Sequence, residues 1–159
     1  MRVGIGVDAH PFVSGRPLIL GGVDIPFDRG LDGHSDADVL THAIIDALLG
    51  AASMGDIGTH FPSSDGRFAG ARGLDLLRWA ADLIAGAGFR VGNVDAVVIA
   101  QAPPLAPYRA EMVAAVAGAL DIPPGVVSVK ATTTDRMGFT GRDEGIAAMA
   151  VALVHETGT

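Results

Sequence analysis

Hydrophobic and polar positions alternate at the start of the chain, where Val3, Ile5 and Val7 are separated by glycines and followed by an acid. A period of two is typical of a β-strand, so we expect a strand over residues 2–9. Apolar runs bounded by turn residues predict the remaining strands. These are residues 18–25 (as one or two short strands), 94–102, 126–133 and 146–154.

Helical spacing marks three other segments. Apolar residues at positions 40, 44 and 48 form one stripe and predict a helix from Ser35 to about Leu49. Ser35 is expected to open this helix, with Asp38 as the acidic partner of a capping box. Two further helices are expected at 74–85 and at about 107–120. Residues 53–70 show no sustained periodicity and predict a long loop, which in small domains is usually functional or mobile.

The order of these elements predicts the fold class, an α/β chain built as an α+β two-layer sandwich. A mixed sheet is expected to carry the helices on one face. The strands around 97–100 and 146–154 are apolar without alternation, and a strand of that kind is covered on both sides. The helices cover one side, and another subunit is the expected cover of the other. Residues 1–159 are expected to form a single domain.

Composition narrows the possible functions. The chain has 159 residues, of which 49% are hydrophobic and 18% charged, so it is not a disordered sequence. Its net charge of −7 argues against nucleic acid or an anionic membrane as a partner. The absence of cysteine excludes disulfides, thiolate catalysis and Cys-ligated metals. With no signal-peptide pattern and no apolar run of about 20 residues, a cytoplasmic location is expected.

Asp8 and His10 are candidate metal ligands, because residues two apart on a strand point to the same side. His42 lies on the first predicted helix, with Asp38 and Asp46 four residues away on either side, where acids could orient its ring. By themselves, Asp8 and His10 fit an acid and a histidine in a turn better than a metal site, and the polar residues of the helix fit a solvated face as well as a site. Together, two imidazoles and one carboxylate form a three-ligand set that leaves one zinc position open for substrate.

A third cluster follows the predicted strand at 126–133. Consecutive threonine hydroxyls and backbone amides at a strand end can hold phosphate oxygens, and Asp135 could bind a hard divalent ion. In isolation, these residues fit an ordinary strand followed by a glycine turn better than a binding site.

Several motifs occur in one order along the chain: Gly4-x-Gly6-x-Asp8-x-His10, Leu20-Gly21-Gly22-Val23-x-Ile25-Pro26, His34-Ser35-Asp36-x-Asp38-Val39, Asp46-Ala47-Leu48-Leu49-Gly50-Ala51, Gly55-Asp56-Ile57-Gly58, Phe61-Pro62, Ala100-Gln101-Ala102-Pro103, Lys130-Ala131-Thr132-Thr133-Thr134 and Gly138-Phe139-Thr140-Gly141-Arg142. They cover the chain from the first strand to the last. In this respect the sequence resembles the 2-C-methyl-D-erythritol 2,4-cyclodiphosphate synthase family.

The resemblance implies a phosphorus–oxygen lyase of the non-mevalonate isoprenoid precursor pathway. Such an enzyme cyclises 4-diphosphocytidyl-2-C-methyl-D-erythritol 2-phosphate and releases CMP, with the substrate's own 2-phosphate attacking the β-phosphorus. Two alternatives stay open on the same scaffold. One is a metal-dependent phosphohydrolase, which would transfer the phosphoryl group to water. The other is a non-catalytic trimeric binding protein.

The resemblance also implies site roles. One zinc per subunit is expected on Asp8, His10 and His42, and magnesium or manganese with the substrate diphosphate beside Asp135. Catalytic contacts to phosphate are implied for His34 and Thr133. The remaining implied substrate contacts are Ser35, Asp56, Ile57, Gly58, Phe61, Pro62, Ser63, Ser64 and Asp65, and, for the CMP part, Ala100, Gln101, Ala102, Pro103, Pro104, Leu105, Ala106, Thr132 and Thr134.

The resemblance further implies a homotrimer with active sites between subunits. An apolar channel on the threefold axis is implied too, in which isoprenoid diphosphates bind near the positions of Phe139 and Arg142 in some members. The sequence departs from the family pattern at four positions. Asp135 stands where Glu is more frequent, Ser63 where an acid is frequent, Pro104 where Lys is common and Val7 where an aromatic residue is common.

Overall fold

The computed structural model describes residues 1–158. Its main sheet has five strands in the order β4-β1-β7-β5-β6, with β5 and β6 parallel and the other neighbours antiparallel. The strands are β1 (Arg2–Ser14), β4 (Arg29–Leu31), β5 (Phe89–Ile99), β6 (Val127–Thr132) and β7 (Gly145–Glu156), and a separate hairpin is formed by β2 (Leu18–Leu20) and β3 (Val23–Ile25). The helices are α1 (Val39–Ala51), α2 (Ile57–His60), α3 (Gly73–Gly86), α4 (Arg109–Leu120) and α5 (Gly138–Gly141).

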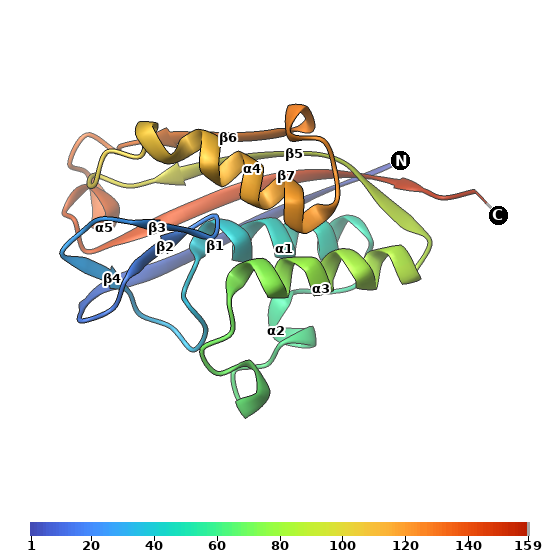
Figure 1. Cartoon of the computed structure of the whole chain (residues 1–159), viewed down its shortest axis with the longest axis horizontal. Coiled ribbons are helices and arrows are strands. Elements are labelled where there is room, and N and C mark those ends of the chain that lie inside the picture. Colours follow the sequence, from blue (N-terminus) through green and yellow to red (C-terminus); the bar gives the residue numbers. More distant parts are fainter. Residues whose placement is uncertain (159) are drawn as a thin grey trace.

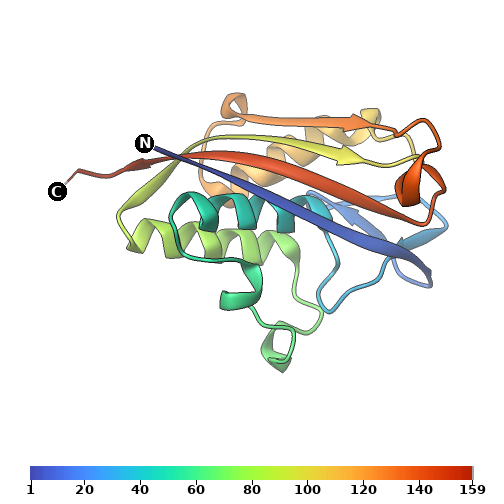
Figure 2. The same ribbon diagram turned by 180° about the vertical axis from the view of Figure 1, so that it is seen from behind.

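The long helices α1, α3 and α4 lie together on one face of the sheet, and the opposite face shows the strands in front (Figures 1 and 2). The expected mixed sheet with helices on one face is therefore confirmed. The predicted loop at 53–70 also holds structure of its own, because it contains α2 and a 3-10 turn at Gly66–Phe68. The short edge strand β4 was missed in the sequence, since three residues are too few to show a period.

The predicted start of the first helix at Ser35 is wrong. The N-cap is Asp38, whose carboxylate accepts hydrogen bonds from the amides of Leu40 and Thr41. Ser35 instead accepts from the amide of Ala37 within an irregular segment. Short polar side chains take backbone amides in this way and so end or begin helices, which explains why α1 starts four residues later than expected.

The helix α1 packs closely against the sheet because small residues form the surface beneath it. Gly4 and Gly6 face the helix, and a Cβ at either position would overlap a backbone carbonyl oxygen of α1, that of Ala47 or Ala43. The row continues across β7, where Ala150 is paired with Gly6 and fully buried. Glycine is required here for close backbone approach, and the whole layer contact depends on it.

The outer face of the sheet is apolar and uncovered in the isolated chain. Val3, Ile5 and Val7 are 65%, 63% and 56% exposed, and on the neighbouring strand Met149 and Val151 are exposed as well. The sequence predicted that the strands around 97–100 and 146–154 are covered on both sides. In this chain the helices cover one side only. A contiguous apolar face of this kind usually marks an interaction surface.

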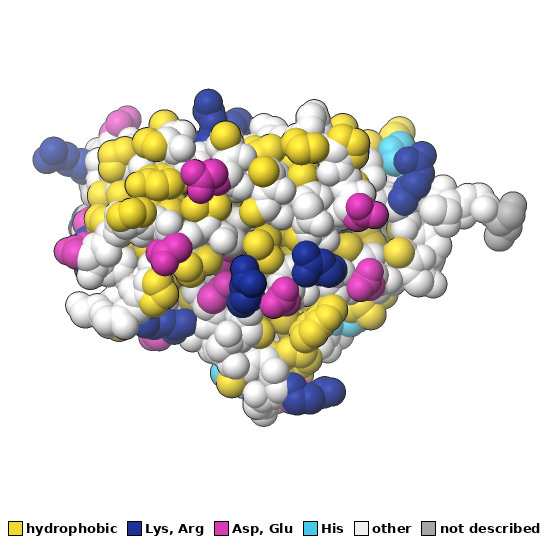
Figure 3. Space-filling model, viewed as in Figure 1, with side chains coloured by type: hydrophobic (Ala, Val, Ile, Leu, Met, Phe, Trp, Pro, Cys, Tyr) yellow, Lys and Arg dark blue, Asp and Glu magenta, His cyan; other side chains and the backbone are white. Residues whose placement is uncertain are grey.

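Acidic and basic side chains are scattered among hydrophobic ones on the helix side of the molecule (Figure 3). Within residues 1–158, no helix has the length and apolar character needed to cross a membrane.

We predict that Gly6→Ala lowers the free energy of unfolding by about 3 kcal/mol, the upper part of the range for overpacked cores, because the new methyl group meets a backbone carbonyl that cannot move aside. The matched control is Gly118→Ala in α4, where a Cβ meets nothing within 4 Å. That substitution is expected to stabilise the helix by up to about 1 kcal/mol. Urea unfolding at one protein concentration measures both, and equal effects of the two substitutions would contradict the packing argument.

Candidate metal centre

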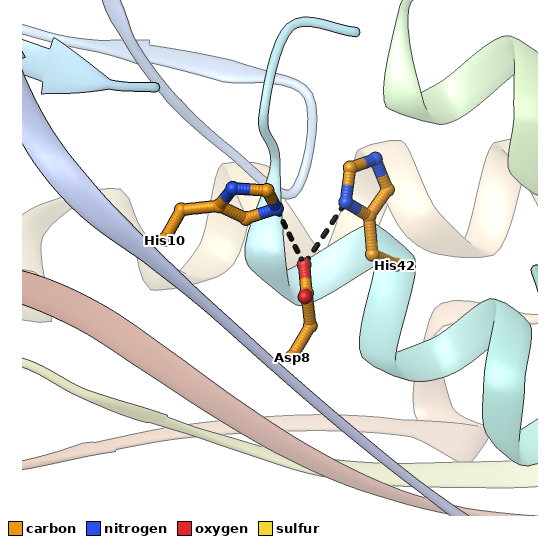
Figure 4. Close-up of side chains that lie close together, drawn as sticks. All are labelled: Asp8, His10 and His42. Carbon is orange, nitrogen blue, oxygen red and sulfur yellow. Dashed lines mark hydrogen bonds and ion pairs between the residues drawn. The ribbon is translucent and has the colours of Figure 1, made fainter. Parts of the chain in front are cut away.

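Asp8, His10 and His42 meet where the first turn of α1 lies beside β1 (Figure 4). One carboxylate oxygen of Asp8 lies 3.0 Å from Nε2 of His10 and 3.0 Å from Nδ1 of His42. One ligand atom from each residue falls within 4.8 Å of the others. The expectation that Asp8 and His10 project from the same side of their strand is confirmed.

Local structure explains the convergence of the three side chains. Asp8 and His10 continue the face of β1 that carries Gly4 and Gly6, so they point toward α1. His42 lies one turn into that helix and is buried. The close packing of α1 on Gly4 and Gly6 therefore brings the ring of His42 within hydrogen-bond distance of the Asp8 carboxylate.

The charges in this cluster reinforce one another. Partial burial of Asp8 acts to raise its pKa, but hydrogen bonds and charge interactions with the two histidines outweigh it and hold the pKa of Asp8 well below its usual range. The hydrogen bond to Asp8 raises the pKa of His10, against the opposing effect of burial. The centre thus keeps a negative carboxylate that attracts positive charge, either a proton on His10 or a cation between the ligands.

Each histidine has a second partner on its outer nitrogen. His10 Nδ1 lies 2.6 Å from the carbonyl oxygen of Asp32, and His42 Nε2 lies 3.1 Å from the hydroxyl of Ser35. A carbonyl only accepts, so the neutral ring of His10 carries its proton on Nδ1 and presents the lone pair of Nε2 to the centre. Outer partners of this kind are typical of metal-ligating histidines, and the three donors suit a divalent metal ion.

The expected role of Asp38 beside His42 is wrong. Its carboxylate is fully buried and accepts hydrogen bonds from the amides of Gly21 and Gly22 at 2.9 and 2.7 Å, in addition to capping α1. Asp38 therefore ties the turn between β2 and β3 to the first turn of α1. Burial, together with the charge of Asp36, raises its pKa to about 6, against the lowering effect of these amides.

Asp46 does not hydrogen-bond to His42 either. Its carboxylate accepts from the amide of Ile57 at 2.7 Å, and burial raises its pKa. It therefore holds the start of α2 against α1. The ring of His42 is oriented by Asp8 and Ser35 instead.

A cavity of about 300 Å³ opens next to the three ligands. Several of the residues predicted to bind substrate line it together with the ligands: His34, Ser35, Ile57, Gly58, Phe61 and Ser63. Phe68 and Leu76 also line it and were missed. Both are apolar, and nothing in their spacing distinguishes a cavity wall from a core position.

Other residues of the predicted 56–65 segment have local roles. Asp56 caps α2 by accepting from the amide and hydroxyl of Thr59 at 2.8 and 2.7 Å. Asp65 forms an exposed ion pair with Arg67. Pro62 and Ser64 lie between them in the same loop, outside the cavity lining.

The remaining predicted contacts form a second group at the ends of β5 and β6. Ala100 donates its amide to the carbonyl oxygen of Thr132, and the side chain of Gln101 accepts from the amide of Arg136, which ties the start of the 100–106 segment to residues 132 and 136. Asp135 is exposed in a left-handed conformation, with its carboxylate 3.5 Å from the hydroxyl of Thr133. The lining of the cavity beside the metal centre includes none of this group.

The sheet order explains why one chain keeps the two groups apart. The strands β7 and β5 lie between β1 and β6, which at about 4.8 Å per strand separates them by roughly 14 Å. Phe139 and Arg142, on and just after α5, lie beyond the end of β6. Phe139 is 42% exposed and Arg142 pairs with Glu144.

Fold and site together define an α+β protein with an Asp–His–His centre for a divalent metal at the wall of a small cavity. The chain belongs to the YgbB family, whose model matches residues 1–155. It is 60% identical to the 2-C-methyl-D-erythritol 2,4-cyclodiphosphate synthase of Pelotomaculum thermopropionicum, over 99% of this chain and 98% of that protein. It is 58% identical to the protein of the same name from Syntrophobacter fumaroxidans, over 99% of each chain.

Among solved structures, the chain resembles the IspF protein of Plasmodium falciparum in complex with CDP. The TM-score is 0.86 at 33% identity, and the likeness covers 99% of this chain and 97% of that one.

We predict that His42→Ala keeps its fold but loses stoichiometric divalent metal. Removal of a ligand should weaken binding by more than the 10- to 100-fold that loss of an outer partner costs. Elemental analysis after dialysis against Zn²⁺ measures the metal, and circular dichroism checks the fold. His155→Ala, on β7 and outside the centre, serves as the control and should keep its metal. A full equivalent of metal in His42→Ala would disprove the assignment of this centre.

Proposed function

We propose that the chain cyclises 4-diphosphocytidyl-2-C-methyl-D-erythritol 2-phosphate to 2-C-methyl-D-erythritol 2,4-cyclodiphosphate and releases CMP, a step of the non-mevalonate isoprenoid pathway. The observation that carries the proposal is the Asp8–His10–His42 centre at the wall of a cavity that also holds His34 and Ile57. Close relatives carry the name of this activity over nearly the whole chain. In this proposal residues 1–159 act as one domain.

The metal proposed for the centre is zinc, one ion per subunit. Its fit rests on the donor set. Two imidazole rings each offer one nitrogen, while the other ring nitrogen is already hydrogen-bonded, and the carboxylate of Asp8 stays ionised. Zinc bound there would supply a Lewis acid for a phosphate oxygen and would leave a position open for substrate. Magnesium or manganese is proposed to accompany the substrate diphosphate beside Asp135.

The reaction asks little covalent chemistry of the protein, since the attacking group is a phosphate oxygen of the substrate itself. The chain's own residues have to bring two phosphates together and offset their charge. His34 is exposed at the cavity wall, where its ring could donate to a phosphate oxygen. Ile57, Gly58 and Phe61 offer an apolar wall for the methylerythritol part.

The CMP part is proposed to bind the second group, at residues 100–106 and 132–135. Thr133 would donate its hydroxyl to phosphate, and Asp135 would face the ion on the diphosphate. Pro104 offers neither a charge nor an amide there, so recognition would depend on its neighbours Leu105 and Ala106. Because one chain holds the two groups apart, we assign each complete site to two subunits of a homotrimer.

The direct test is to incubate the pure protein with the cytidyl substrate, Zn²⁺ and Mg²⁺ and to identify the products by mass spectrometry. CMP together with the cyclic diphosphate is the expected result. A linear product that has taken up water would indicate a phosphohydrolase. Unchanged substrate that stays bound to the metal-loaded protein would indicate a binding protein.

For the assembly, we predict that the wild type has the mass of a trimer by light scattering and that Ile5→Asp does not. The substitution places a charge in the exposed apolar face of the sheet, where burial between subunits would be costly. Trp79→Glu, on the helix side and 46% exposed, is the control and should stay trimeric. A monomeric wild type with full activity would contradict both the assembly and the shared site.

At the second group, we predict that Asp135→Asn lowers turnover severely and that high magnesium or manganese restores part of it, whereas Asp135→Glu is mild. Asn tolerates the left-handed backbone found at this position, so the substitution removes the charge while the turn is kept. Steady-state rates over a magnesium titration measure the effect. Full activity of Asp135→Asn at low magnesium would reduce Asp135 to a turn residue.

A further inference from the structure

The segment from Asp32 to Ser35 supplies the outer partner of both histidines in the metal centre. The carbonyl oxygen of Asp32 lies 2.6 Å from Nδ1 of His10, and the hydroxyl of Ser35 lies 3.1 Å from Nε2 of His42. This histidine loop, residues 32–35, therefore fixes which ring nitrogen of each ligand faces the metal. Any movement of the loop would change both ligands at once.

The histidine loop belongs to no helix or strand, so its carbonyls need partners from elsewhere. All four are satisfied. That of Asp32 is bonded to the ring of His10, and that of His34 accepts from the amide of Gly70 at 2.9 Å. The other two both accept from the guanidinium of Arg16, whose Nη1 and Nη2 are the donors.

Arg16 comes from the turn between β1 and β2 and is separated in sequence from the loop that it holds. Its Nη1 lies 2.7 Å from the carbonyl oxygen of Gly33, and its Nη2 lies 2.5 Å from that of Ser35. The two carbonyls flank His34, so a single planar group spans the residue that lies between them. An ion pair with Asp32 at 3.6 Å is more exposed and contributes little.

The geometry favours arginine over lysine. A guanidinium offers donors in a fixed fork, whereas an ammonium is a single point of charge on a flexible stem. The fit is also tight on the opposite side of the loop, because a Cβ at Gly33 would lie 3.0 Å from Cε1 of His10. The backbone of Gly33 therefore lies beside the imidazole ring, with no room for a side chain between them.

We infer that Arg16 is a positioning residue, which holds the histidine loop in the conformation that orients His10, His42 and His34. Arg16 is neither one of the three ligands of the metal centre nor a lining residue of the cavity. Its effect on turnover rests on the proposed function, but its effect on metal binding does not. That difference allows the two to fail separately.

The test compares zinc-loaded wild type with Arg16→Met and Arg16→Lys. The release of Zn²⁺ to an excess of a chromogenic chelator is followed by absorbance. We expect release to be about 10-fold faster in Arg16→Met, the lower end of the effect of outer partners on metal affinity. Arg16→Lys should give little rescue, because one ammonium cannot bridge two carbonyls. Full rescue by lysine would overturn the role of the fork.

The control for a purely structural effect is Arg29→Met. Arg29 has nearly the same side-chain exposure as Arg16, 29% against 31%, and also bonds to a carbonyl and a carboxylate, both of Asp143. We expect Arg29→Met to lower the melting temperature without faster zinc release. If Arg16→Met behaves in the same way, Arg16 only stabilises the fold and the inference is wrong.

Two further readouts separate positioning from stability. Nitrogen-15 NMR of the ring nitrogens should show one tautomer for each zinc-bound histidine in the wild type and broadened or exchanging signals in Arg16→Met. With the cytidyl substrate, kcat should fall by about the factor seen in zinc release while KM changes little. If the wild type makes no CMP, the proposed function fails, whereas the zinc and NMR results still decide the role of Arg16.

Discussion

The close approach of α1 to β1 is the contact on which the rest of the structure depends. It exists only because Gly4 and Gly6 present no side chain to the helix, so that backbone lies on backbone. The same face of the strand continues into Asp8 and His10, and the helix carries His42 one turn from its start. A bulky residue at either glycine would raise the helix and remove the one ligand that comes from outside the strand. The same two glycines therefore determine both the packing of α1 on the sheet and the geometry of the metal centre.

Carboxylates do much of the remaining organisation, by accepting backbone amides rather than by pairing with arginine or lysine. Asp38 joins the β2–β3 turn to α1, Asp46 joins α2 to the same helix, and Asp36 accepts from the amide of Gly73 at the start of α3. An ionised carboxylate bonds strongly to amides, and a helix start favours negative charge. These acids hold irregular segments around the metal centre without adding cations that would repel a metal.

The sequence predicted the class of fold and the shared face of Asp8 and His10, because both depend on short-range periodicity. The alternation in β1 puts Asp8 and His10 on one face, and the stripe of α1 fixes where the helix lies. The helix start was misplaced, since Ser35 and Asp38 are both good N-caps and only tertiary contacts with Gly21 and Gly22 decide between them. The role of Asp38 was wrong for the same reason. Arg16 gave no signal at all, because its partners are carbonyls, which every residue has.

The same reasoning explains why the chain looks incomplete alone. The metal centre and the segment that carries Thr133 and Asp135 lie toward the same end of the strands, but β7 and β5 separate them across the sheet. At the usual spacing of neighbouring strands, this order separates β1 from β6 by roughly 14 Å, so one chain keeps the metal centre apart from the group around Thr133 and Asp135. The apolar outer face of β1 and β7 would be buried favourably against other copies in the homotrimer that we propose, in which each complete site combines two subunits. The proposed assembly and the metal centre then depend on opposite faces of the same strand, since Val3, Ile5 and Val7 alternate along β1 with Gly4 and Gly6, which position the metal ligands.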